Sequence, residues 1–125
     1  MAIKNGNVIQ AKTGSSAYTT AINTAVFTLP SGAMPIGVRI VGTASNAATT
    51  GVLTFKNIPS DTGVAATFAV ADVKTATGNT GLFAITAYSG VAFTRVTVSQ
   101  TITVSYTETG GAASAGAWTF VLEYL

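Results

Sequence analysis

The chain has 125 residues, no cysteine, no histidine, and only ten charged residues, six basic and four acidic, for a net charge of +2. The composition excludes disulfides, thiolate metal sites and the commonest general base and metal ligand. No apolar run approaches the roughly 20 residues of a membrane-spanning helix, and the scattered cations form no cluster that could neutralise several phosphates of a nucleic acid. We therefore expect one domain over residues 1–125, made in a cytoplasm, with no metal, no cofactor, and no membrane or nucleic-acid partner.

Turn signals recur at short intervals along the chain, at Asn5-Gly6, Ser31-Gly32, Ser45-Asn46, Pro59 to Gly63, Gly78-Asn79, Ser89-Gly90 and Gly110-Gly111. The runs between them are rich in β-branched and aromatic residues, which is typical of an all-β sandwich or barrel. In chain order, strands are predicted at residues 7–12, 25–29, 36–43, 51–56, 65–71, 82–88, 91–94, 96–107 and 117–124. The predicted fold is an antiparallel β-sandwich of about eight strands, with the jelly roll as a candidate arrangement.

Two of these runs have one clearly apolar side. In the run 36–43, Ile36, Val38 and Ile40 form one side, opposite Arg39, Val41 and Thr43. In the run 117–124, the alternation places Trp118, Phe120, Leu122 and Tyr124 on one face. Because successive side chains of a strand point to opposite faces, both apolar sides are predicted to be walls of the core.

The middle of the chain is harder to interpret. Ser60 is a candidate helix cap, but the alternation of Val64, Ala66, Phe68 and Val70 favours a strand there. Further on, Ser89-Gly90 predicts a hairpin between residues 82–88 and the run that starts at Val91. The apolar positions then change from odd to even numbers, which predicts a bulge or bend around Thr94-Arg95.

The run 96–107 alternates almost without fault and carries no charge between Arg95 and Glu108. If straight it would be roughly 40 Å long, so a bend or a change of sheet is expected near Gln100. A neutral strand of this kind lacks the usual protection against pairing with other chains. It must be covered by its own sheet or by an assembly. The small-residue segment 110–116 that follows is interpreted as a hairpin connector.

Catalytic motifs are missing from the sequence. The four carboxylates Asp61, Asp72, Glu108 and Glu123 are the only basis for a hydrolase of the two-carboxylate type. No histidine is present to activate a serine, and no Asp-x-Asp-x-Asp-Gly loop or glycine-rich phosphate loop occurs. A single calcium held by loop carbonyls would leave no trace in the sequence. We expect a protein that is not an enzyme.

Three segments resemble the small β-sandwich virion proteins of tailed bacteriophages. They are Val26-Phe27-Thr28-Leu29-Pro30-Ser31-Gly32-Ala33, then Ile36-Gly37-Val38-Arg39-Ile40, and the final Gly116-Ala117-Trp118-Thr119-Phe120-Val121-Leu122-Glu123-Tyr124-Leu125. In that group a Leu-Pro-x-Gly turn leads into a strand, and the chain ends in a Val-Glu-Tyr-like strand. The resemblance implies a capsid decoration or head-associated protein, with some relatives in tails or fibres.

The function expected on this basis is that of a non-enzymatic decoration or cement protein, present in many copies on the outside of a phage head. Its partners would be the major capsid protein or other virion proteins, and its location the virion surface after synthesis in the host cytoplasm. The predicted assembly contacts are Ile3, Val8, Ile9, Thr97, Thr101 and Thr103, with β-augmentation by residues 2–12 as one mode of binding. The alternative is a tail-fibre or adhesin-type module that binds glycans, based on Trp118, Tyr88 and the Gly-Ser-Asn loops.

Overall fold

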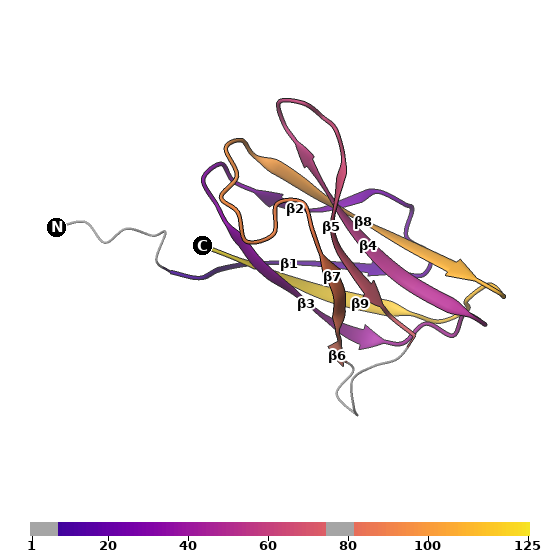
Figure 1. Ribbon diagram of the computed structural model, residues 1–125. Coiled ribbons are helices and arrows are strands. Elements are labelled where there is room, and N and C mark those ends of the chain that lie inside the picture. The colour runs from indigo at the N-terminus through magenta and orange to yellow at the C-terminus, as the bar shows by residue number, and fades with distance from the viewer. Residues whose placement is uncertain (1–7, 75–81) are drawn as a thin grey trace.

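The computed structural model describes residues 8–74 and 82–125, and within them the chain forms nine strands and no helix. They are β1 (Gln10–Ala17), β2 (Thr24–Leu29), β3 (Pro35–Thr43), β4 (Thr50–Pro59), β5 (Ala66–Asp72), β6 (Leu82–Phe83), β7 (Ile85–Tyr88), β8 (Gln100–Thr109) and β9 (Ala117–Tyr124). The four-stranded sheet has the order β1-β9-β3-β6 and the five-stranded sheet the order β2-β8-β4-β5-β7. The two sheets form layers (Figure 1), and the predicted antiparallel sandwich is confirmed with nine strands.

The core between the sheets is centred on three phenylalanine rings. Phe120, from β9 of the four-stranded sheet, contacts Phe55 of β4 edge-on, with ring centroids 5.0 Å apart, and Phe27 of β2 at 6.4 Å. All three side chains are at most 4% exposed. Edge-to-face pairs of this kind add to the free energy of burial, so these rings join the two sheets. The apolar face predicted for 117–124 is confirmed, because Trp118, Phe120 and Leu122 are buried.

The predicted strands 25–29, 36–43 and 117–124 agree with β2, β3 and β9 to within one residue at each end. A strand is also found at Ala66–Asp72, so the helix considered after Ser60 is wrong. Strand β4 runs on to Pro59, three residues beyond the predicted end.

The first strand, in contrast, lies further along the chain than expected. It continues to Ala17 through Thr13, Gly14, Ser15 and Ser16, which carry no apolar signal. The strand forms there because it pairs with β9 from Gln10 opposite Tyr124 to Ala17 opposite Ala117.

The predicted strand at 91–94 and the hairpin at Ser89-Gly90 are wrong. Residues 89–99 form an irregular segment (the 89–99 segment) that begins with two turns, in which the backbone N–H of Ala92 donates to Ser89 and that of Thr94 to Val91. Of the bulge or bend predicted around Thr94-Arg95, the bend is found, at Thr94, and the bulge is not, because no strand runs through these residues. Strand β8 begins at Gln100, where the sequence predicts a bend, so the predicted strand 96–107 loses its first four residues. Val96 is still buried, and its backbone is hydrogen-bonded to Gly32 and Ala33.

Most successive strands belong to different sheets, so most connections cross from one layer to the other. The segment 110–116 links β8 of the five-stranded sheet to β9 of the four-stranded sheet, and the interpretation as a hairpin connector is wrong. The predicted strand 82–88 likewise divides at Ala84. Its first part, β6, pairs with β3, and its second part, β7, pairs with β5.

Candidate assembly surfaces

The outer face of the four-stranded sheet carries two opposite charges that neutralise each other. Arg39 of β3 donates from Nε to Oε1 of Glu123 on the neighbouring β9 at 2.7 Å. In the same register, Val121 lies between Thr13 of β1 and Arg39, and Thr119 between Ser15 and Val41. This face is therefore lined by small, hydroxyl-bearing and aliphatic side chains, and its two charges, Arg39 and Glu123, are paired with each other.

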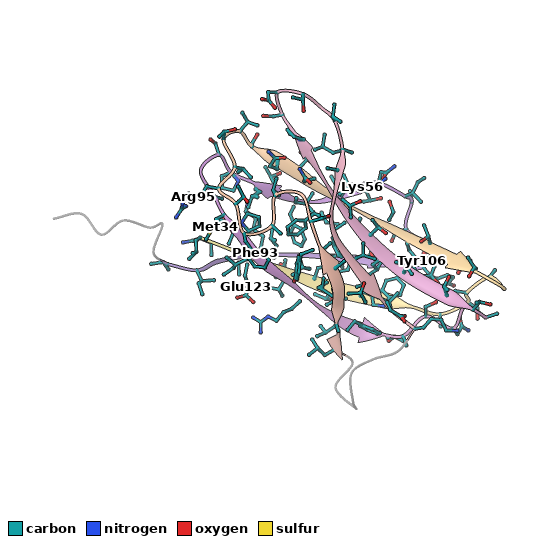
Figure 2. The ribbon with its side chains drawn as sticks, in the orientation of Figure 1. Met34, Lys56, Phe93, Arg95, Tyr106 and Glu123 are labelled. Carbon is teal, nitrogen blue, oxygen red and sulfur yellow. The ribbon has the colours of Figure 1, made fainter. Side chains whose placement is uncertain are left out.

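The outer face of the five-stranded sheet carries an unpaired cation among hydroxyl side chains. On adjacent strands, Thr54 lies opposite Ser105 and Lys56 opposite Thr103. Lys56 has no hydrogen-bond or ion-pair partner among residues 8–74 and 82–125. In Figure 2 it lies well apart from Glu123 and Arg95. The acidic residue of this face is Asp72, which pairs with Val52, four residues or about 13 Å along β4 from Lys56.

A hollow of about 340 Å³ lies beside Lys56 on this face. It is lined by Ile22 and Asn23 from the β1–β2 turn, Thr54 and Lys56 from β4, and Ser105 and Thr107 from β8. Asn23 has a left-handed φ of 57° and donates its backbone N–H to Ser105 Oγ at 2.8 Å. The same Oγ donates to Asn23 Oδ1 at 3.1 Å. These two bonds fix the turn against the sheet, so the hollow is built before any partner arrives.

The described residues among the predicted contacts lie in three segments of the chain. Thr101 and Thr103 are neighbours on the outer face of β8, but Thr103 is only 4% exposed and offers little area to a partner. Thr97 lies in the 89–99 segment, where its carbonyl accepts a hydrogen bond from Ser31. Val8 and Ile9 precede β1 and are half exposed. Ile3 lies outside the described residues.

Residues 2–12, the predicted augmenting segment, are only partly described. From Gln10 on, the segment is a strand of its own sheet, paired with β9.

Lys56 was not among the sequence candidates. Its signal was its position as the single charge of the predicted strand 51–56, on the side opposite Leu53 and Phe55.

One end of the sandwich carries an exposed aromatic ring and a shallow depression. The depression, of about 310 Å³, is lined by Gln10, the 30–33 turn, Arg95, Tyr124 and Leu125. Phe93 is 60% exposed and has a φ of 61°. Its backbone N–H donates to Pro35, and its ring lies edge-on to Tyr88. Figure 2 shows Met34, Phe93 and Arg95 at the same end as the C-terminus.

At the opposite end, a chain of side-chain hydrogen bonds holds the loops together. Tyr106 bonds to Ser45 and donates to Glu108 Oε2 at 3.0 Å, and that carboxylate also accepts from the backbone of Ala113 at 2.9 Å. Burial, followed by the neighbouring Glu108, raises the pKa of Tyr106, while Ser45 opposes the shift. The phenol therefore keeps its proton at neutral pH, which suits a structural tie rather than a base.

The carboxylates Glu108, Glu123 and Asp61 lie in different parts of the fold. Glu108 is bonded to the loop that precedes β9, whereas Glu123 lies six residues into β9, about 20 Å further along. Asp61 is exposed in the β4–β5 connection. Among the residues that the structure describes, no group of three or more acidic, histidine or cysteine side chains is placed to hold a metal. No helix in those residues is suited to cross a membrane.

Two solved capsid structures contain chains with this fold. In the acidic stable capsid structure of Helicobacter pylori bacteriophage KHP30, a chain of 13% identity superposes with a TM-score of 0.65, over 95% of this chain and 88% of that one. In the cyanophage Pam1 capsid asymmetric unit, a chain of 16% identity gives a TM-score of 0.56, over 99% and 89%. No family model and no curated protein matches the sequence. The fold is therefore that of a small β-sandwich found in phage capsids.

Proposed function

We propose that this chain is a structural, non-enzymatic component of a bacteriophage virion, bound to the outside of the head as a decoration or cement protein. The observation that carries the proposal is the match to two capsid chains, because it takes in 88% and 89% of their lengths. The match extends over nearly the whole of each neighbouring chain. Each of these capsid chains is therefore, like this one, a small protein that consists mainly of a single β-sandwich.

The surface supports the same function. Only ten of 125 residues are charged, far fewer than the roughly one quarter usual for a globular domain, so much of the outside is made of threonine, serine, alanine and glycine. A neutral surface of small and hydroxyl side chains loses less free energy of hydration than a charged surface when another protein covers it. With many copies on one shell, weak contacts of this kind add up through avidity. The partners would be the major capsid protein or other virion proteins.

The glycan-binding alternative depended mainly on Trp118, and the structure places this residue in the core. Trp118 is 2% exposed and stacks on Tyr106 at 5.2 Å inside the protein, so it cannot offer a face to a sugar. The hydroxyl of Tyr88 is engaged with the backbone of Val38. A hydrolase would need two carboxylates across a cleft, whereas Glu108 is bonded to Tyr106 and the backbone of Ala113, and Glu123 is paired with Arg39.

The test is reconstitution with the shell. Shells assembled with and without this chain are heated, and the release of packaged contents or of subunits is followed with temperature. A cement protein raises the temperature of shell failure, and imaging locates the chain on the outer surface. Equal heat resistance, or a chain absent from purified virions, would contradict the proposal.

A further inference from the structure

We propose that the hollow beside Lys56 is a docking site for a carboxylate side chain of the neighbouring virion protein, which makes the outer face of the five-stranded sheet the assembly face. The inference rests on the proposed function and adds to it a face, an anchoring residue and the chemistry of the partner group.

The first argument is the difference in charge between the two outer faces. On the four-stranded sheet, the charges of Arg39 and Glu123 satisfy each other at 2.7 Å. On the five-stranded sheet, Lys56 has no partner in the described part of the chain. Asp72, the acidic residue of the same face, forms no ion pair with Lys56. One oxygen of its carboxylate instead accepts a hydrogen bond from the backbone N–H of Lys74 at 2.8 Å. A positive charge without an internal partner is complementary to an acidic group from outside.

The second argument is how Lys56 is held. The side chain is only partly exposed, in the middle of a sheet rather than at a mobile loop tip. The register irregularity between β4 and β5 lies in β5, where Phe68 is the extra residue, while β4 pairs with β8 without a break and places Lys56 opposite Thr103. Because the lysine lies in a rigid sheet, forming an ion pair costs less conformational entropy there than it would for a lysine on a loop.

The third argument is the lining of the hollow. The hydroxyl of Thr54, two residues before Lys56 on the same face of β4, can donate to a second carboxylate oxygen, and Ile22, which also lines the hollow, is 67% exposed and presents an apolar surface. The site therefore fits a glutamate or aspartate next to an aliphatic residue on the partner. A phosphate-rich nucleic acid fits less well, because it would need several cations, and Lys56 is the one basic residue on the described strands of this sheet.

The experiment measures binding of the purified chain to shells assembled without it, by co-sedimentation over a range of salt concentrations. We expect Lys56→Gln to weaken binding about tenfold and Lys56→Glu to weaken it further, since truncating one partner of a desolvated charge pair leaves the other unpaired. The affinity of the unaltered chain should fall with added salt, and that of Lys56→Gln should depend on salt less steeply. The matched control is Lys12→Gln, which removes a partly exposed strand lysine from the other sheet.

The possible results separate the two proposals. If the unaltered chain does not bind shells, the proposed function fails. If it binds and Lys56→Gln binds equally well with the same salt dependence, the docking site is wrong while the function stands. Equal losses for Lys12→Gln and Lys56→Gln would also overturn the site, because they indicate a general charge effect. Binding of acidic glycans rather than shells through Lys56 would overturn both. Unchanged thermal unfolding midpoints show that each variant is folded.

Discussion

The hydroxyl of Tyr88 makes two hydrogen bonds to the backbone of Val38, accepting from its N–H at 3.0 Å and donating to its carbonyl at 3.3 Å. Tyr88 is in β7 of the five-stranded sheet and Val38 in β3 of the four-stranded sheet. Strand β6 reaches β3 only at Ile40 and Val41, so the edge at Val38 has no strand beside it. One phenol thus occupies the place of a strand and joins the two layers, protecting an open edge.

Replacing Tyr88 tests whether its hydroxyl stabilises the open edge of β3. Tyr88→Phe keeps the ring contacts with Phe68 and Phe93 but leaves two backbone groups of Val38 without a partner. We expect the free energy of unfolding to fall by about 1–3 kcal/mol, measured by urea denaturation. The control is Tyr18→Phe, whose hydroxyl has no hydrogen bond within the described residues. That change should alter stability by less than about 0.5 kcal/mol. Equal effects of the two variants would refute the role of the Tyr88 hydroxyl.

The aromatic cluster between the sheets predicts a larger loss. Phe120 is fully buried and contacts both Phe27 and Phe55. Phe120→Ala should lower the free energy of unfolding by about 3–5 kcal/mol, because a cavity replaces the ring that joins the layers. Phe93→Ala, at a 60% exposed position, should cost less than about 1 kcal/mol in the same assay. A loss below about 1.5 kcal/mol for Phe120→Ala would contradict the claim that the Phe120 ring joins the two sheets at the centre of the core.

Two glycines with positive φ separate backbone strain from steric contact. At Gly63, with φ 66°, an added Cβ meets nothing within 4 Å, so Gly63→Ala should cost about 1–2 kcal/mol from strain alone. At Gly42, with φ 153°, the Cβ would lie 2.9 Å from the Cα of Trp118 and closer still to the carbonyl of Ala117. Gly42→Ala should cost clearly more and disturb the β3–β9 pairing, visible as faster amide exchange in β9. Similar losses at both sites would contradict the close approach of these strands.

The raised pKa of Tyr106 predicts a dependence of stability on alkaline pH. Since the folded pKa lies above the unfolded value of about 10, the contribution of Tyr106 is fully present below pH 10 and is lost as pH rises through the folded value. In Tyr106→Phe, the free energy of unfolding should therefore decline less steeply above pH 10 than in the unaltered chain. Chemical denaturation from pH 8 to 11 measures the two slopes. A steeper decline in the variant would mean that the sign of the shift is wrong.

The local sequence pattern predicted where most strands lie, but it did not predict which strands pair with each other. The alternation in 117–124 placed Trp118, Phe120 and Leu122 in the core because the period of two is a property of the strand itself. The same reasoning failed at Val91 to Thr94, where Val91 and Phe93 alternate with smaller residues but the backbone forms turns, with Ala92 donating to Ser89 and Thr94 to Val91. It failed also at Thr13 to Ala17, a polar stretch that is a strand only because β9 lies beside it.

By itself, the sequence determined the class of fold and the inward faces of β2, β3 and β9, since side-chain alternation and turn residues act over a few neighbouring positions. Only the tertiary structure decided which sheet each strand joins and what stands next to Lys56. Ser105 meets Asn23 across 82 residues of chain, and Tyr88 meets Val38 across 50. Hydrogen bonds over such separations form when the layers pack, and they leave no periodic trace in the order of the amino acids.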